Sequence, residues 1–370
     1  MRYHQLKDMR ISTLGLGGIR YPTEEGNPDR FDREKGRELI KAAFNRGINY
    51  FDTAHIYKNG ESEALLGEIL SEYPRESYYL ADKFHVGYCT DIEAMFEEQL
   101  KRCKVDYFDF YMLHSLDEKN IEKYMDPELD LLGFILREKE KGRIRNIGFS
   151  SHAGPETLKR FLEWYDGFDM ALIQLNYLDW TLLHAKEQYE ILTAHNIPVW
   201  AMEPQKGGKL AVLNEEAAAI LKAAAPERSI ASWGFRFLQS LPNLKTMLSG
   251  MATLEQIEDN ANTFDVYDPL SEEELKILEQ AAAVYRRDMG VPCSACRYCC
   301  ETCPAGLDIP LLIQGYNELK ISGGTWKVPG YSQTKKASEC LQCGVCAEHC
   351  PQKIAIPQIL QELTEMEKKK

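Results

Sequence analysis

Two runs of cysteine near the end of the chain share one spacing and could bind metal. In each, intervals of two, two and three residues separate four cysteines, and a proline follows the last. The first run is Cys293, Cys296, Cys299 and Cys303, and the second is Cys340, Cys343, Cys346 and Cys350. Thiolates grouped in this way are ligands for zinc or iron–sulfur clusters, and clustered cysteines in a reducing compartment favour metal binding over disulfides. We expect Cys89 and Cys103 to be ordinary helix or core thiols.

The spacing resembles that of bacterial two-cluster ferredoxins, in which the fourth cysteine of each run ligates the other cluster. The resemblance implies two 4Fe–4S clusters. The first cluster takes Cys293, Cys296, Cys299 and Cys350, and the second takes Cys340, Cys343, Cys346 and Cys303.

Two other interpretations fit these cysteines less well. A duplicated four-cysteine run that ends in proline does not match two zinc sites. Cys296, Cys300 and Cys303 have the C-x3-C-x2-C spacing of radical S-adenosylmethionine enzymes, but that register leaves Cys293 and Cys299 unused and has no match in the second run. We therefore expect Cys300 to be the spare thiol of the first run.

A second set of residues, Asp52, Tyr57, Lys83 and His114, could move a proton. A lysine beside a tyrosine lowers the phenol pKa from its usual value near 10. An aspartate can fix the lysine, and a histidine can hydrogen-bond a substrate oxygen. Together they form a general acid that protonates a carbonyl oxygen as hydride reaches the carbon. Any one of them alone is more often a cap or a loop anchor.

The elements that must position these residues are β-rich runs that alternate with helical patterns. The expected strands are 14–18, 49–54, 78–84, 108–114, 144–151, 170–177, 198–204 and 244–250, and the helical patterns include 33–47, 62–70, 91–103, 129–142 and 185–196. Eight such units predict a (β/α)8 TIM barrel, whose catalytic side chains lie where strands end. An open doubly wound sheet is the alternative, but LGLGGIRYP lacks the GxGxxG spacing that it needs.

The chain divides into a barrel over residues 1–288 and a small, mostly helical dicluster ferredoxin-like domain over 289–370. Residues 4–13 are expected to form a hairpin that plugs the barrel floor. Residues 271–288 should form a helix that is capped by Ser271, and residues 310–324 another within the second domain.

The charge of the chain excludes some classes of partner. The net charge is −13, of which residues 291–370, with nine Lys/Arg and eight Asp/Glu, contribute +1, so residues 1–290 carry −14. An acidic barrel argues against nucleic acid. MRYHQLKDMRIS has no apolar segment of a secretion signal, and no run of 18 apolar residues occurs, so we expect a cytoplasmic protein that does not enter membranes.

Residues 5–265 resemble the aldo/keto reductase superfamily. The motifs are LGLGG (14–18), FDTAHIY (51–57), ADKF (81–84), LH (113–114), IRNIGFSSH (144–152), IQLNY (173–177) and LSGMATLEQIEDN (248–260). The resemblance implies that Tyr57 is the proton donor, that Asp52 and Lys83 tune it, and that His114 orients the substrate. It also implies a nicotinamide cofactor, whose carboxamide contacts are Ser150, Ser151 and Gln174, and whose further contacts include Gly250, Gln256 and Asn260.

Two positions depart from that family. Met202 occurs where a tyrosine often stacks on the nicotinamide ring, and Ala252 occurs where an arginine usually pairs with the 2′-phosphate of NADPH. Without that cation, selection for the phosphate should weaken. NADPH therefore cannot be assumed, and NADH or a flavin in the same groove is an alternative cofactor.

The combination predicts an oxidoreductase of small carbonyl or alcohol substrates, whose clusters connect the barrel to a one-electron carrier such as ferredoxin or flavodoxin. One alternative is a plain NAD(P)H carbonyl reductase with structural clusters. Another is a redox sensor or scaffold whose barrel binds nucleotide. The complete tetrad of Asp52, Tyr57, Lys83 and His114 argues against this second alternative.

Overall fold

A closed barrel of eight parallel strands forms the first part of the protein in this computed structural model, which describes residues 1–288, 290–322, 325, 328 and 331–368. The strands are β3 (Leu14–Gly17), β6 (Tyr50–Asp52), β7 (Tyr79–Phe84), β8 (Phe108–Leu116), β9 (Ile144–Ser151), β10 (Met170–Gln174), β11 (Val199–Met202) and β12 (Leu244–Ser249). Each pairs with the next along the chain, and β12 pairs with β3. The predicted TIM barrel is confirmed, and the open doubly wound sheet is excluded.

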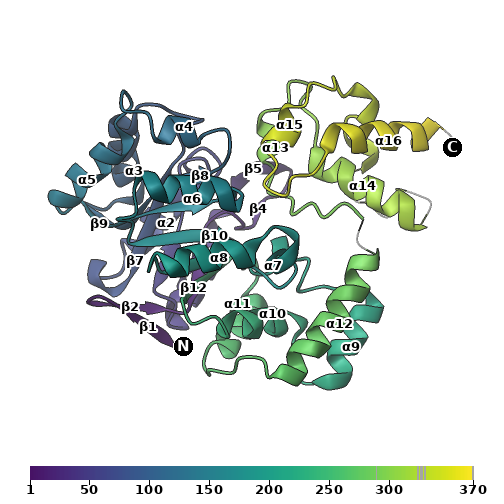
Figure 1. Ribbon diagram of the computed structural model, residues 1–370, viewed down its shortest axis with the longest axis horizontal. Coiled ribbons are helices and arrows are strands. Elements are labelled where there is room, and N and C mark those ends of the chain that lie inside the picture. The colour runs from purple at the N-terminus through teal and green to yellow at the C-terminus, as the bar shows by residue number, and fades with distance from the viewer. Residues whose placement is uncertain (289, 323–324, 326–327, 329–330, 369–370) are drawn as a thin grey trace. The chain divides into compact units, whose positions relative to one another are not determined.

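Helices surround these strands (Figure 1). They are α1 (Arg33–Asn45), α2 (Glu61–Leu70), α3 (Ile92–Cys103), α4 (Ile121–Tyr124), α5 (Leu131–Glu140), α6 (Pro155–Trp164), α7 (Asp179–Leu182), α8 (Ala185–Ala194), α9 (Glu215–Ala224), α10 (Ile230–Gln239), α11 (Leu254–Thr263) and α12 (Glu272–Asp288). Side chains of Asp32, Asp91, Ser229 and Thr253 accept first-turn amides, which satisfies donors that a helix start leaves unpaired. The predicted cap of α12 is confirmed, because Ser271 Oγ accepts the amide of Glu274 at 3.2 Å.

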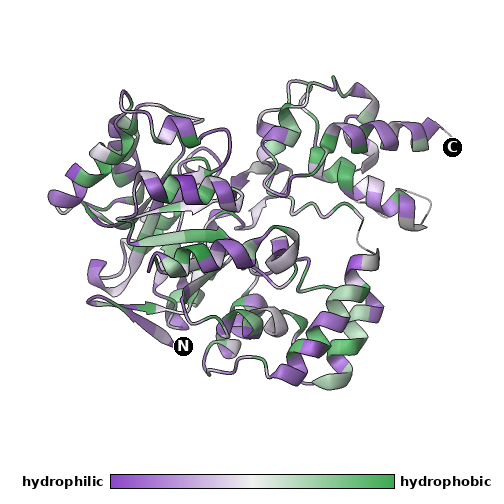
Figure 2. Ribbon diagram, in the orientation of Figure 1, coloured by the Kyte–Doolittle hydropathy of each residue, from purple (hydrophilic) through white to green (hydrophobic). Residues whose placement is uncertain are grey.

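The floor of the barrel is closed by a hairpin of β1 (Tyr3–Leu6) and β2 (Met9–Ser12). Met9 and Ile11 are buried and pack against interior residues of the strands, such as Tyr50, Phe110 and Trp200. The predicted plug is therefore confirmed. Figure 2 shows the apolar residues along strands such as β10. A second hairpin, β4 (Thr23–Glu24) with β5 (Asn27–Phe31), follows the first barrel strand and was not expected from the sequence.

The cysteine-rich part is mostly helical, as predicted. Its helices are α13 (Tyr298–Glu301), α14 (Ile309–Ser322), α15 (Val345–Glu348) and α16 (Ile356–Lys368), and it has short 3-10 turns at Tyr331–Gln333 and Ala337–Glu339. Two further 3-10 turns lie earlier in the chain, at Arg75–Ser77 and Lys206–Gly208. Apolar residues of α14 and α16 pack into one buried core with Cys299, Cys346 and Cys350. The helix expected over 310–324 is α14, and its last two expected residues, Gly323 and Gly324, lie outside the described residues.

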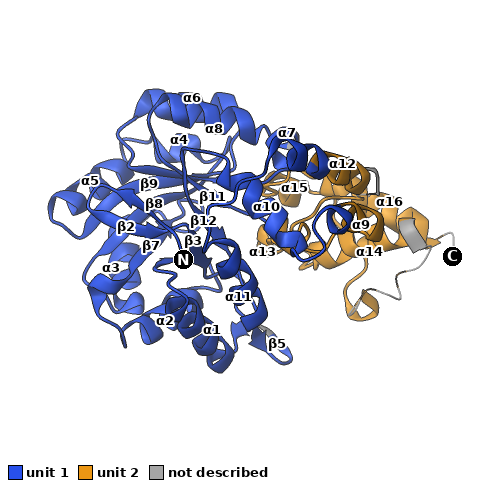
Figure 3. Cartoon of the chain, turned by 90° about the horizontal axis from the view of Figure 1, so that it is seen from below, with its two compact units in different colours: residues 1–205, 221–278 blue, residues 206–220, 279–370 orange. Residues whose placement is uncertain are grey.

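The chain forms two compact units (Figure 3). Unit 1 contains Met1–Gln205 and Leu221–Leu278, and unit 2 contains Glu279–Lys370 together with Lys206–Ile220. A segment that follows β11 in the sequence thus packs with the cysteine-rich part. The domain boundary expected at residue 288 stays a prediction. Within the part of the chain that the structure describes, no helix combines the length and apolar character that a membrane span requires.

Candidate functional site

Asp52 and Lys83 form a buried ion pair at the carboxyl ends of β6 and β7. The Lys83 ammonium donates to Asp52 Oδ1 at 2.5 Å and to the carbonyl oxygen of Thr53 at 2.7 Å. Burial raises the pKa of Asp52, and the Lys83 charge opposes that rise. Because either partner alone would leave an uncompensated buried charge, each fixes the other in place.

Tyr57 and His114 complete this group. The Tyr57 hydroxyl lies 3.4 Å from Lys83 Nζ, and the ammonium lies 4.9 Å from the centre of the tyrosine ring. The rings of Tyr57 and His114 meet edge to face with 5.8 Å between their centres. The structure thus brings together four residues that come from β6, the loop after it, β7 and β8.

The surroundings of Tyr57 hold its phenolic proton in place. Burial raises the pKa of Tyr57 well above its usual value, and three carboxylates act in the same direction, those of Asp52, Asp82 and Glu203. The sequence predicted a lowered pKa for Tyr57 because of the Lys83 charge, and this prediction is wrong, since the pKa is raised. The physical reason is that burial has the larger effect and that the Lys83 charge is already paired with a carboxylate. A phenol that keeps its proton is the form that a general acid needs.

Four histidines gather at the same end of the barrel: His55, His85, His114 and His152. Burial lowers the pKa of His114 well below its usual value, and the charge of Lys83 acts in the same direction. His114 is therefore neutral at pH 7, and its Nδ1 is buried without a hydrogen-bond partner among the described residues. A neutral imidazole can hydrogen-bond a substrate oxygen without adding a second positive charge beside the lysine.

Ser150, Ser151 and Gln174, the expected carboxamide contacts, are all buried at the carboxyl ends of β9 and β10. Ser150 Oγ accepts the backbone amide of Ser115 at 2.7 Å, and Ser151 Oγ accepts the amide two residues further on at 3.1 Å. Gln174 Nε2 donates to Asp179 Oδ2 at 2.8 Å. Each serine oxygen is thus fixed as an acceptor, which leaves its hydroxyl proton to donate to a ligand.

Asp179 and Arg20 belong to this site and were missed by the sequence analysis. Asp179 Oδ2 accepts from Gln174 and, at 2.6 Å, from Asn176 Nδ2, which also donates to the carbonyl oxygen of Glu203 at 3.0 Å. Arg20 donates to Glu203 Oε1 at 3.3 Å. Asp179 lies in α7 and Arg20 in a loop, so a search of strand ends does not reach them. The Asn-x2-Asp spacing after β10 is the signal that could have found Asp179.

Met202 ends β11 as the register partner of Gln174 and is half-buried. Its side chain packs against the interior cluster of the barrel. A thioether offers an adaptable apolar surface but no hydroxyl and no aromatic face. The structure therefore places no ring at this position to stack on a nicotinamide.

The expected adenine contacts lie on α11 and just before it. Thr253 caps α11 by accepting the amide of Gln256 at 3.3 Å, and Gln256 Oε1 accepts the amide of Ala252 at 2.8 Å. Asn260, one turn further on, is buried and donates to a serine hydroxyl of β12 at 3.3 Å. At Gly250 a Cβ would lie 2.9 Å from an arginine side chain, so the position suits glycine. The sequence from Gly250 to Asn260 contains no lysine or arginine.

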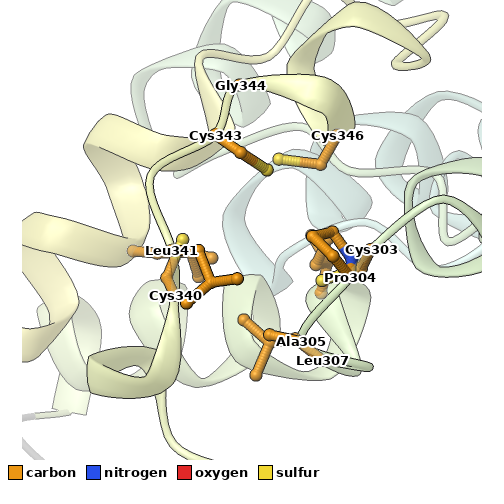
Figure 4. Close-up of a pocket in the computed structure, with 11 residues that line it drawn as sticks. Cys303, Pro304, Ala305, Leu307, Cys340, Leu341, Cys343, Gly344 and Cys346 are labelled. Carbon is orange, nitrogen blue, oxygen red and sulfur yellow. The ribbon is translucent and has the colours of Figure 1, made fainter.

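One cysteine group lines a pocket in unit 2. Its cysteines are Cys303, Cys340, Cys343 and Cys346, and the other lining residues are Pro304, Ala305, Leu307, Ile309, Leu341, Gly344 and Leu360. Figure 4 shows the side chains of Cys343 and Cys346 with their sulfur atoms pointing toward each other. Four thiols in apolar surroundings are the donor set that a 4Fe–4S cluster takes, so these residues fit the second expected cluster. Among the described residues, no three of His, Cys, Asp and Glu surround one point as a single metal ion requires.

The other cysteine group is also close together in space. Burial raises the pKa of Cys293, and Cys350 is one of the thiols that act in the same direction. A hydrogen bond with Cys300 raises the pKa of Cys299, followed by burial and by nearby thiols that include Cys296 and Cys293. The last cysteine of the second run therefore lies near the first cysteine of the first run, and the assignment of these residues as ligands of one cluster stays a prediction. Cys300 packs against the core of this unit with its thiol beside Cys299.

Comparison with known proteins identifies both parts of the chain. Residues 13–283 match the aldo/keto reductase family, and residues 292–355 match the 4Fe-4S dicluster domain. The chain belongs to the aldo/keto reductase family. It is an oxidoreductase of that family with a 4Fe–4S dicluster ferredoxin domain at its C-terminal end.

Individual relatives agree with this assignment. The uncharacterized oxidoreductase YqkF of Bacillus subtilis is 26% identical over 306 residues, which are 74% of this chain and 93% of the relative. A probable aldo-keto reductase of Glycine max is 30% identical over 161 residues, 40% of this chain and 44% of the relative, so the chain spans less than half of that protein. The holo form of an aldo-keto reductase from Bacillus halodurans has a TM-score of 0.62 at 23% identity, over 76% of this chain and 96% of that structure. An aldo-keto reductase from Klebsiella pneumoniae in complex with NADPH has a TM-score of 0.60 at 20% identity, over 77% and 95%. These two likenesses show the fold.

Proposed function

We propose that the protein reduces small carbonyl compounds, or oxidises the corresponding alcohols, with a nicotinamide bound in the barrel and with two 4Fe–4S clusters that exchange electrons with a one-electron carrier. The observation that carries this proposal is the buried hydrogen-bonded chain from Asp52 through Lys83 to Tyr57, in a protein that also has a pocket lined by four cysteines. The first arrangement suits proton transfer, and the second suits electron transfer.

The side chains of the barrel would handle the proton. Tyr57 donates its phenolic proton to the carbonyl oxygen, which becomes the hydroxyl of the alcohol. Lys83, held by Asp52, stabilises the phenolate that this transfer leaves behind. His114 orients the carbonyl oxygen through a hydrogen bond from a neutral ring. When bound, NAD(P)H supplies the hydride, which carries the two electrons that reduce the carbonyl carbon.

The residues of the site fit a nicotinamide, but they do not include a group that would select NADPH over NADH. Ser150 and Ser151 offer buried hydroxyl protons near Gln174, as a carboxamide requires. The absence of a cation from Gly250 to Asn260 removes the usual partner of a 2′-phosphate. An Escherichia coli relative named NADH-specific methylglyoxal reductase, 25% identical over 192 residues, or 46% of this chain and 57% of the relative, fits the same view. A flavin is the alternative two-electron cofactor, because a flavin exchanges electrons both singly and in pairs.

The cysteine-rich unit would handle single electrons. An iron–sulfur cluster exchanges one electron, whereas a nicotinamide gives up a hydride. A flavin, in this chain or in a partner, would therefore take the hydride, release its proton to water and pass the two electrons singly to the two clusters. The partner that we propose is a ferredoxin or a flavodoxin. Cys343 is exposed, and Leu341 beside it is 66% exposed, so a carrier can approach the second cysteine group from solvent.

The test is an anaerobic experiment on the full chain with its iron and sulfide. NADH or NADPH is added with and without a panel of small aldehydes and ketones, while cluster reduction is followed by EPR and carbonyl reduction by product analysis. The proposal expects clusters that become reduced by the nicotinamide when flavin is present, and carbonyl turnover that falls by about 10²–10⁴-fold in Tyr57→Phe.

Two results would contradict the proposal in different ways. Carbonyl turnover with clusters that never change oxidation state would make the clusters structural. The absence of turnover, with Tyr57→Phe indistinguishable from wild type in every assay, would leave a sensor or scaffold. Tyr267→Phe is the matched control, since Tyr267 is 57% exposed, and this variant should behave like wild type in both assays.

A further inference from the structure

The segment Lys206–Ile220 packs with the cysteine-rich part, although the sequence places it between two elements of the barrel. It begins with three residues in the left-handed region, Lys206 (φ 46°), Gly207 (φ 66°) and Gly208 (φ 90°). Glycine takes that conformation without cost, whereas lysine does so at about 1 kcal/mol or more.

The Lys206 side chain reaches the loop that carries the last cysteine of the chain. Its Nζ donates to Gln352 Oε1 at 2.6 Å, and both residues are buried, with 2% and 8% of their surfaces exposed. Gln352 lies two residues after Cys350, and its backbone amide donates a hydrogen bond to the Cys350 thiol. A buried ammonium is thus fixed against a residue that hydrogen-bonds a proposed cluster ligand, where solvent screens its charge poorly.

The second cysteine group has different surroundings. Of the described residues that line its pocket, none is a lysine or an arginine. A lysine also lies near this group, because the Lys335 ammonium donates to the carbonyl oxygen of Ala305, a lining residue of the pocket, at 2.6 Å. Lys335, however, is exposed. Water screens such a charge far more than it screens Lys206.

We propose that Lys206 tunes the cluster that Cys293, Cys296, Cys299 and Cys350 hold, by stabilising its reduced state and so raising its reduction potential. This inference rests on the proposed binding of two clusters. Net charge near a cluster and hydrogen bonds to its sulfurs set its potential. Reduction adds one negative charge to a cluster whose four thiolates already make it anionic, so a fixed cation favours the reduced form. Lys206 acts on the cluster through its positive charge, and Gln352 holds its ammonium in place.

The experiment is an EPR-monitored redox titration of the full chain, with iron and sulfide measured on each sample. In Lys206→Met, one of the two midpoint potentials should fall by about 59 mV or more, which is a tenfold change in a one-electron equilibrium constant. The other midpoint should not move. Lys206→Arg keeps the charge and should restore most of the lost potential. Lys335→Met is the matched control, and both of its potentials should equal those of wild type.

The outcomes separate this inference from the proposed function. Full iron and two unchanged potentials in Lys206→Met would overturn the inference and leave the clusters standing. Wild-type protein that holds no iron and sulfide would overturn the clusters, and the inference with them. If Lys206→Met does not fold, Lys206→Gln provides the same test, because its amide can still hydrogen-bond Gln352 while it carries no charge. Unchanged potentials in that variant overturn the inference equally.

Discussion

The charge states of the tetrad are set residue by residue through burial. Tyr57 keeps its proton and His114 stays neutral, so the ammonium of Lys83 is the cation beside the site of proton transfer. A second cation on His114 would compete for the same carboxylate and substrate oxygen. In the proposed reaction this arrangement separates two roles, since Tyr57 would move the proton and Lys83 would stabilise the charge that remains.

Ala252 provides a test of cofactor choice at a single residue. Ala252→Arg adds a guanidinium just before α11, where the family usually pairs one with the 2′-phosphate of NADPH. A hydrogen bond to a charged group is worth about 1.5–3 kcal/mol, which is roughly ten- to a hundredfold in Kd. We expect NADPH to bind more tightly to this variant by that factor, with NADH unchanged, as measured by fluorescence titration. Ala252→Gln, which adds bulk without charge, is the control. Equal gains for both nucleotides would refute the interpretation of this position.

His55 provides a test of stability against pH. Burial lowers the pKa of His55 from 6.5 to about 4, and its Nε2 accepts the backbone amide of His85 at 3.0 Å. Between these two values the unfolded chain binds a proton that the folded chain does not, so stability falls as pH falls from about 6.5 to about 4. His55→Gln keeps an acceptor but cannot titrate. Its free energy of unfolding should therefore decline less steeply over this range, by up to about 1.4 kcal/mol per pH unit.

Urea unfolding at pH 7 and pH 5 measures that difference. His184→Gln serves as the control, since the His184 side chain is 69% exposed. If wild type and His55→Gln lost the same unfolding free energy between pH 7 and pH 5, His55 would not be the group that titrates.

At the scale of elements, helix α3 holds the strand that carries Lys83. Gln99 on α3 donates from Nε2 to Asp82 Oδ1 at 2.8 Å and to the carbonyl oxygen of Lys83 at 3.1 Å, and its Oε1 accepts from Tyr111 at 2.6 Å. It also donates to Glu63 of α2 at 3.1 Å. One buried side chain thus ties two strands and two helices together at the position of Lys83.

Gln99→Leu should therefore damage both stability and activity. Each buried polar group that loses its partner costs about 1–3 kcal/mol, so we expect a loss of about 3 kcal/mol or more in the free energy of unfolding. Turnover should fall as well, because the backbone of Lys83 loses a hydrogen bond. Equilibrium urea unfolding and carbonyl turnover measure the two effects. Gln358→Leu on the exposed face of α16 is the control, and a Gln99→Leu protein as stable as this control would contradict the role assigned to α3.

The elements of the barrel could be predicted because their signals are local. Apolar runs between helical patterns placed all eight strands, and the expected strand at 198–204 is β11 (Val199–Met202). The prediction fails just beyond β11. Glu203 and Lys206 have positive φ, which the sequence alone does not indicate for residues other than glycine. The β4–β5 hairpin was missed for a related reason, since Pro28 lies inside β5 and proline within a run argues against a strand.

The residues of the candidate site could be predicted from the sequence, but their pKa values could not. Strand ends and family motifs located Asp52, Tyr57, Lys83 and His114, because each follows from local position. The pKa of Tyr57 depends instead on how deeply the fold buries it, and burial outweighs the lysine. The hydrogen bond from Lys206 to Gln352 spans 146 residues of sequence, so no local pattern could reveal it.

At the scale of the whole molecule, the two units are joined by more than one passage of the chain. The sequence leaves unit 1 after Gln205, contributes Lys206–Ile220 to unit 2, and returns to unit 1 at Leu221 before it enters unit 2 again at Glu279. A chain that ends at residue 288 would keep the inserted segment but lose Gln352. The buried Lys206 ammonium would then lack the acceptor that holds it.

We therefore expect removal of residues 289–370 to open the inserted segment while the barrel stays folded. Lys206 is 2% exposed in the full chain, so trypsin should cut after it slowly. Loss of a hydrogen bond to a charged group, about 1.5–3 kcal/mol, should raise the open population and the cleavage rate by roughly tenfold or more. Mass spectrometry of timed digests measures this rate, with Lys141, whose side chain is 63% exposed, as the internal control that both chains should cut equally. Equal cleavage after Lys206 in both chains would mean that the segment is ordered by the barrel alone, and would favour a simple domain boundary at residue 288.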